Sequence, residues 1–155
     1  MLLRLIAAGT RMPAWVNEAF AEYAGRLTAD YRLELKEIAL GQRSGSNAQQ
    51  AIAKEGERMM AALPARSYVV ALQVAGKAFS SEQLARFLQA RARDGRDVVF
   101  LIGGPDGIAA EVDARADERW SLSALTLPHG LARVMVAEAL YRAVSIVKGH
   151  PYHRA

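Results

Sequence analysis

The sequence predicts an α/β fold with a mostly parallel sheet and helices on both of its faces. Two patterns lead to this class. The apolar runs at 68–74 and 97–102 carry hydrophobic residues on both faces, which is typical of strands buried inside a parallel sheet. Helical patterns stand between the expected strands, and a helix is the usual connection between parallel neighbours. No internal repeat or linker is visible, so residues 1–155 are expected to form a single domain.

The first part of the chain is expected to contain two strands and two helices. Residues 2–8 form a short apolar run, and Pro13 stands at the beginning of an amphipathic helical pattern. Residues 32–38 alternate like a half-buried strand, and the segment GQRSGSN at 41–47 is a turn-rich loop. A second helix follows this loop and ends before Pro64.

The middle of the chain repeats the alternation. The continuous apolar run 68–74 indicates a strand in the interior of the sheet. Ser80 and Gln83 have the spacing of a capping box at the start of the next helix, and Gly95 stands where a glycine commonly follows a helix. The strand expected at 97–102 comes next, which completes a second strand, helix and strand unit.

The last third of the chain changes in character. A short helical stretch is expected at 108–119 and a long final helix at 131–148. The final helix is apolar over more of its circumference than packing against one sheet requires. This pattern favours a second copy of the chain as its partner; alternatively, the helix is buried within one chain.

Composition excludes several classes of protein. The chain has no cysteine, which excludes disulfides, thiolate metal sites and thiol redox chemistry. No run approaches the roughly 18 apolar residues of a membrane span. The first residues lead into a helical pattern rather than a cleavage site, so a cytoplasmic protein is expected. The net charge of +4 is compatible with a polyanionic partner without requiring one.

The end of the chain is locally basic and aromatic. No acidic residue follows Glu138. The residues that carry this character are Tyr141, Arg142, Lys148, His150, Tyr152, His153 and Arg154. Aromatic rings stack on unpaired bases and cations hold phosphates, so this segment is typical of contacts with looped RNA. Alternatively, it is a solvated tail.

Two segments are candidates for binding a small ligand. The glycine-rich loop IGGPDG at 102–107 follows a buried strand, and ligands of open α/β sheets bind at the carboxyl ends of strands. Its spacing matches neither a dinucleotide-binding fingerprint nor a P-loop, which disfavours NAD and ATP. The segment LSALTLPH at 122–129 mixes leucines with small polar residues, which suits a pocket for an adenine ring. Alternatively, the first is a plain turn and the second an edge strand.

Metal and hydrolase chemistry find little support. His150 and His153 are three residues apart and His129 lies upstream, but no carboxylate accompanies them at ligand spacing and no HExxH motif occurs. A serine hydrolase would need a GxSxG elbow, which is also absent from the sequence. Neither a metal nor acyl-transfer chemistry is therefore expected.

The chain resembles a known family from end to end. The resemblance rests on AAGT near the start, KEGE at 54–57, DGRDV at 94–98, IGGPDG, SLSALTLPH, RVMVAEALYRA and the terminal HPYHR. These motifs are similar to those of the small single-domain SPOUT methyltransferases that methylate N3 of pseudouridine in 23S ribosomal RNA. The chain has no appended RNA-binding domain, which is also characteristic of that group.

The resemblance implies a C-terminal trefoil knot, which periodicity would not predict because knots are rare exceptions to fold rules. It also implies S-adenosylmethionine as methyl donor, a homodimer, and 23S rRNA as substrate in the context of the ribosome. Carried over by position, the residues around the donor are Leu72, Gly103, Gly104, Leu122, Ser123, Ala124, Leu125, Thr126 and Leu127.

For the RNA side of the reaction, the candidates that accept or relay the proton are His129, Tyr152 and His153, and the last two could come from the other subunit. Arg133 and Arg142 are expected to hold phosphate or uracil oxygens, with Glu138 orienting these cations. Alternatively, each side chain is a buried or solvated structural residue. Two other classes stay open: an RNA-binding assembly factor without catalysis, and a nucleotide-dependent α/β enzyme that lacks its usual fingerprint.

Overall fold

The computed structural model describes residues 1–27, 30–43, 45 and 47–154. Within them, the strands form one sheet in the order β2-β1-β4-β3-β5, and every neighbouring pair is parallel. The strands are β1 (Leu2–Ala8), β2 (Arg32–Ile38), β3 (Tyr68–Ala78), β4 (Val98–Ile102) and β5 (Glu118–Ser121). The helices are α1 (Ala14–Ala24), α2 (Ala48–Ala62), α3 (Ser81–Arg93), α4 (Ala110–Arg115) and α5 (His129–Lys148), followed by the 3₁₀ helix η1 (Pro151–Arg154).

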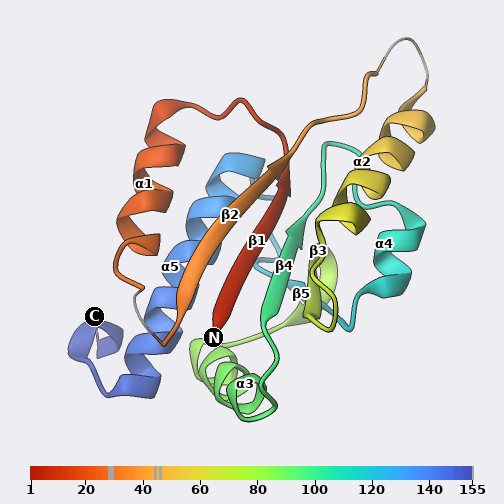
Figure 1. The fold of residues 1–155 in the computed structure, drawn as a ribbon. Helices are drawn as coiled ribbons and strands as arrows, with labels where there is room; N and C mark the ends of the chain where they lie inside the picture. The colour runs from red at the N-terminus through yellow and green to blue at the C-terminus, as the bar shows by residue number, and fades with distance from the viewer. Residues whose placement is uncertain (28–29, 44, 46, 155) are drawn as a thin grey trace.

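Helices cover both faces of the sheet (Figure 1). On one face, α1, α3 and α5 close a core that contains Phe20, Leu88 and Leu140. On the other face, α2 and α4 close a second, smaller core around Met59 and Val112. The predicted α/β class with a parallel sheet covered on both faces is therefore confirmed. The trefoil knot stays a prediction.

Most expected elements occur where the sequence places them. The capping box of α3 is present: Gln83 N donates to Ser80 Oγ over 3.0 Å, and Ser80 N donates to Gln83 Oε1 over 2.7 Å. Gly95 follows α3 with φ of +68°, a conformation that glycine adopts without steric cost. Pro13 directly precedes α1, which begins at Ala14, one position later than expected. Of the expected loop at 41–47, Ser44 and Ser46 lie outside the described residues.

Two expectations about the last third are wrong. The helix predicted at 108–119 is shorter, because α4 ends at Arg115 and Glu118–Ser121 forms the edge strand β5. The short strand forms because it pairs with β3 and places Trp120 in the aromatic core, which is non-local information that helical periodicity misses. The alternative of an edge strand at 122–129 is also wrong, since 122–128 has no regular structure.

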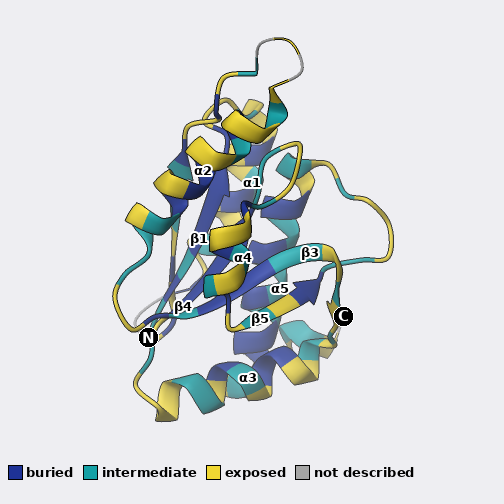
Figure 2. Cartoon of the chain, turned by 90° about the vertical axis from the view of Figure 1, so that its right-hand side faces the viewer, coloured by how far each residue is buried: buried dark blue, intermediate teal, exposed yellow. Residues whose placement is uncertain are grey.

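The final helix runs the full height of the sheet (Figure 1). It begins with His129 and ends near the amino ends of β1 and β2, where Lys148 lies 3.6 Å from the Asp30 carboxylate. Most of its residues on the sheet side are buried, as Figure 2 shows in dark blue. Its 20 residues span about 30 Å at 1.5 Å per residue. The segment after α5 therefore lies at the opposite end of the sheet from His129.

No helix among the described residues has the length and apolar character needed to cross a membrane. The same residues contain no cluster of three or more histidine or carboxylate side chains that could hold a metal ion.

Candidate functional site

A pocket of about 910 Å³ opens at the carboxyl ends of β3 and β4. Three segments that are far apart in the sequence line it: 72–75 from β3, 102–108 after β4, and 121–127 after β5, with His129 at one side. The glycine loop and the leucine-rich segment, which the sequence singled out separately, thus border one cavity. Open α/β sheets usually bind their ligands at this carboxyl edge.

The glycine loop is packed closely against its own backbone. A Cβ atom on Gly103 would lie 2.8 Å from Ile108 Cγ1 and 2.9 Å from the carbonyl of Gly107, so no larger residue fits without moving the loop. Gly107 N donates to Gly104 O over 3.1 Å and closes the turn around Pro105. Gly107 itself has φ of +92°, which favours glycine.

A bulge in β3 forms a wall that the sequence did not predict. Trp120 of β5 pairs with both Leu72 and Lys77, so the residues between them leave the regular register. Gly76 makes this possible, because a Cβ atom there would lie 2.5 Å from the Trp120 backbone. The bulged residues 73–75 line the pocket. A glycine inside a strand pattern is the signal that could have revealed it.

An ionised carboxylate lies on the same wall. Asp113 Oδ1 accepts hydrogen bonds from Arg119 Nε at 2.8 Å and from Gln73 Nε2 at 2.7 Å. These two bonds lower the pKa of Asp113, with the bond from Arg119 as the larger cause. Neither Gln73 nor Asp113 was among the predicted site residues, although both line the pocket.

The segment after β5 is shaped by its own hydroxyl groups. Ser121 Oγ donates to Ser123 O over 2.9 Å, and Ser123 Oγ accepts from Leu125 N over 2.9 Å. Of the residues predicted to surround the donor, all but one line the pocket: Leu72, Gly103, Gly104, Leu122, Ser123, Leu125, Thr126 and Leu127. The exception is Ala124, which is exposed and is not part of the pocket lining.

His129 is the predicted proton-handling residue that borders the pocket. Burial and, to a smaller extent, the nearby Arg133 cation lower the pKa of its imidazole to about 4, against the opposing effect of Glu37. Its position in the first turn of α5 acts in the same direction, because helix N-termini disfavour cations. The ring is therefore neutral near pH 7, and its Nε2 has no hydrogen-bond partner among the described residues.

Arg133 does not take the expected position. Its side chain is fully buried, donating to Glu37 Oε2 at 2.6 Å and to Gly9 O at 2.7 Å. The prediction that Arg133 holds phosphate or uracil oxygens is therefore corrected: this guanidinium ties the start of α5 to the ends of β1 and β2. Helical periodicity could not distinguish this inward position from an outward one.

The remaining candidates form a separate cluster along α5 and η1. Glu138 Oε2 accepts from Arg142 Nη2 at 2.7 Å and from the Tyr152 hydroxyl at 3.0 Å; of the two cations that it was expected to orient, it contacts Arg142, whereas Arg133 pairs with Glu37. Burial and the Glu138 carboxylate raise the pKa of Tyr152 to about 12, which keeps the phenol protonated. The Tyr152 ring lies 4.5 Å from that of Tyr141. The alternative of a freely solvated tail does not hold, since Tyr152 and His153 are half-buried.

This cluster does not reach the pocket within one chain. Tyr152 and His153 follow the far end of α5, and the Tyr152 hydroxyl reaches back to Glu138, which is about 14 Å along the helix from His129. Arg142, Glu138 and the η1 residues are absent from the pocket lining formed by the described residues. One chain thus presents the donor-side candidates and His129 at the pocket, and the basic aromatic candidates further along α5, where Glu138 lines a separate groove that shares Leu122 with the pocket.

The fold and the pocket define an α/β protein with a cavity at the carboxyl edge of a parallel sheet. A family model described as "Predicted SPOUT methyltransferase" matches residues 1–153. The chain belongs to this family.

Curated relatives match over the full length. A protein of Stenotrophomonas maltophilia (strain K279a) is 54% identical over 156 residues, covering all of both chains. A protein of Dichelobacter nodosus (strain VCS1703A) is 53% identical over 157 residues, again with full coverage. Both carry the name "Ribosomal RNA large subunit methyltransferase H".

Solved structures share the fold at low sequence identity. A putative methylase family protein from Neisseria gonorrhoeae has a TM-score of 0.58 at 14% identity, covering 90% of this chain and 81% of that one. A probable rRNA-methyltransferase from Porphyromonas gingivalis has a TM-score of 0.55 at 15% identity, covering 93% and 68%. At these identities, the two structures support the fold alone.

Proposed function

We propose that this protein is an rRNA methyltransferase that transfers a methyl group from S-adenosylmethionine to N3 of a pseudouridine in 23S rRNA. The observation that carries the proposal is the pocket in which the glycine loop 102–107 and the segment 121–127 meet. Membership of the SPOUT family and the rRNA methyltransferase names of full-length relatives support the same reaction. A cytoplasmic location, where ribosomes are found, follows from this proposal.

The residues of the pocket fit the methyl donor. Leu72, Leu122 and Leu127 provide apolar surface for an adenine ring. The ionised carboxylate of Asp113 lines the same pocket, and it suits a ligand that carries ammonium and sulfonium cations. When bound there, S-adenosylmethionine would supply an electrophilic methyl group.

The residues of this chain would place the acceptor base and manage its proton. A neutral His129 can exchange hydrogen bonds with a uracil edge without repelling a cationic donor. With a pKa of about 4, however, its imidazole is a weak proton acceptor. We therefore assign His129 to orienting the base and His153 of the terminal segment to relaying the proton, with Arg142 holding uracil or phosphate oxygens.

This division of roles requires a second copy of the chain. Tyr152 and His153 are absent from the pocket lining among the described residues, and the Tyr152 hydroxyl is held by Glu138, about 14 Å along α5 from His129; in this proposal they therefore serve the pocket of a partner subunit. A partly apolar groove of about 300 Å³ borders the donor pocket at Leu122 and includes Val134 and Met135 of α5. We propose that a homodimer forms over this groove, which explains the surplus apolar character of α5.

A charge placed in the groove is expected to break the dimer. Met135→Lys should give a monomeric mass in light scattering, because burying its ammonium group under a partner subunit costs free energy even beside Glu138, which also lines the groove. The monomer should still bind S-adenosylhomocysteine but lose nearly all methyl transfer. The matched control is Met60→Lys, which replaces a half-buried methionine of α2 outside the lining of both the groove and the donor pocket. A fully active Met135→Lys monomer would contradict the composite site.

The function itself is tested on ribosomal RNA. Nucleosides from 23S rRNA of cells that lack this protein should have lost one N3-methylated pseudouridine by mass spectrometry, and the purified protein with the methyl donor should restore it. S-adenosylhomocysteine should also raise the melting temperature of the protein. RNA binding without either result would instead support an assembly factor without catalysis.

A further inference from the structure

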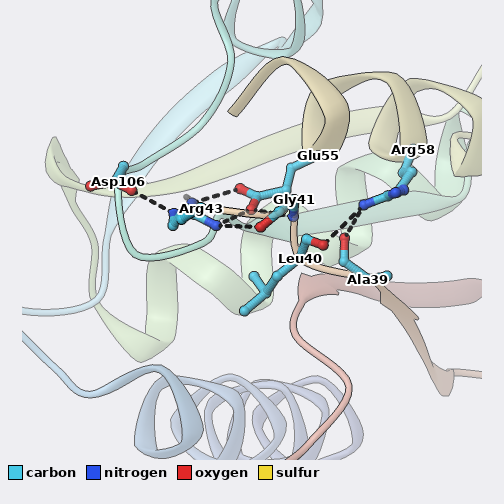
Figure 3. A network of polar contacts seen from close by, with 7 residues as sticks. All are labelled: Ala39, Leu40, Gly41, Arg43, Glu55, Arg58 and Asp106. Carbon is cyan, nitrogen blue, oxygen red and sulfur yellow. Dashed lines mark hydrogen bonds and ion pairs between the residues drawn. The ribbon is translucent and has the colours of Figure 1, made fainter. Parts of the chain in front are cut away.

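A buried carboxylate on α2 organises a set of contacts beside the donor pocket (Figure 3). The Glu55 side chain is 4% exposed and accepts from Gly41 N at 2.9 Å and from Arg43 Nη1 at 2.7 Å. Arg43 then reaches across with its Nε, which donates to Asp106 Oδ2 at 2.7 Å. Arg43 thus joins α2 to the corner of the glycine loop.

The segment that carries Arg43 is itself fixed on α2. Arg58 Nη1 donates to Ala39 O at 2.9 Å and to Leu40 O at 3.1 Å (Figure 3). Gly41 is pressed against the helix so closely that a Cβ atom there would lie 2.4 Å from Ala51 O. Arg43 therefore projects from a rigid base rather than from a free loop, and less entropy is lost when it holds a partner.

The glycine loop is anchored from the same side. A Cβ atom on Gly104 would lie 2.7 Å from Glu55 Oε1, so the loop backbone passes directly over the carboxylate. Pro105 and Asp106 form the exposed outer corner of the loop. Among the described residues, Arg43 is the hydrogen-bond donor to the Asp106 carboxylate. Arg43 therefore connects this corner to α2.

We propose that Arg43, held by Glu55, is a positioning residue for the donor-binding pocket, and that it acts through Asp106 by fixing the wall at 102–107. The inference rests on the proposed function, because it assigns the pocket to the methyl donor. Without its contact to Arg43, the corner of the loop samples more conformations. Part of the free energy of donor binding is then lost in ordering the loop. Donor affinity should fall while the chemical step stays the same.

The test combines two substitutions that each keep Glu55 paired. Arg43→Lys retains the positive charge beside Glu55, but a lysine cannot contact Glu55 and Asp106 at once. Asp106→Ala leaves the Arg43–Glu55 pair intact. Each single variant should weaken S-adenosylhomocysteine binding about fivefold in calorimetry. The KM for the donor should rise equally, with kcat at saturating donor unchanged. Arg4→Lys is the control, because Arg4 has the same 24% exposure and pairs with Glu34 away from the pocket.

The double variant separates positioning from direct contact. If Arg43 acts through Asp106, the Arg43→Lys/Asp106→Ala protein should also lose about fivefold, not about 25-fold. A multiplied loss would overturn the proposal, because Asp106 would then touch the donor independently of Arg43. Unchanged affinity in Asp106→Ala would overturn it as well. If the parent protein binds no S-adenosylhomocysteine, the proposed function fails; if only the variants are unaffected, the role of Arg43 alone fails.

Discussion

Replacement of Gly103 by valine is expected to weaken S-adenosylhomocysteine binding by about 30-fold to 100-fold. The side chain would not simply fill the pocket: its Cβ atom would lie within 2.9 Å of the Gly107 backbone and 2.8 Å from Ile108 Cγ1. The glycine loop must move to make room, and it forms one wall of the pocket. Isothermal titration calorimetry measures the loss directly.

Gly25→Val is the matched control for this prediction. Gly25 follows α1 with φ of −66°, which any residue adopts, and a Cβ atom there has its nearest contact at 3.0 Å. This variant should keep the donor affinity of the parent protein. Gly103→Val that still binds S-adenosylhomocysteine normally would show that the glycine loop is not part of the donor site, and the proposed function would lose its main structural support.

The sequence predicted strands where the local pattern is regular, both for the half-exposed β2 and for strands with apolar residues on both faces. Both-face apolar runs identify β3 and β4 without knowledge of their neighbours. β5 was missed because its sequence, ERWS, mixes charge with one aromatic residue and becomes a strand only through pairing with β3. A strand whose stability comes from a distant partner leaves little local signal.

The site was predictable in its segments but not in its geometry. Turn residues and a leucine-rich segment identified two walls of the pocket, since both features are local. The third wall at 73–75 depends on a bulge that pairing with Trp120 creates. The direction of α5 separates His129 from His153, and this separation follows from how the helix crosses the sheet rather than from spacing. The contact between Arg43 and Asp106 also joins residues with no local relation.

The largest effect on stability is expected at Trp120, which connects the fold to the pocket. Its ring is 5% exposed and lies 4.6 Å from that of Phe87 and 4.8 Å from that of Phe79. Trp120→Ala should lower the free energy of unfolding by about 3 to 5 kcal/mol, from lost burial and the cavity left behind. Urea denaturation measures this loss. It is a large part of the roughly 5 to 15 kcal/mol by which most domains are stable.

Trp15→Ala provides the control for this substitution, because the Trp15 side chain on α1 is 55% exposed and the same atoms are removed with little burial lost. It should change stability by less than about 1 kcal/mol. The stability of Trp120→Phe should lie between those of the two alanine variants, since it keeps an aromatic ring but loses the 2.9 Å hydrogen bond from Nε1 to Glu118.

Trp120 also holds the β3 bulge and leads into 121–127, so donor affinity should fall in the same order as stability. Equal stability of the two alanine variants would contradict the burial of Trp120, and a stable fold with unchanged donor affinity would separate β5 from the pocket.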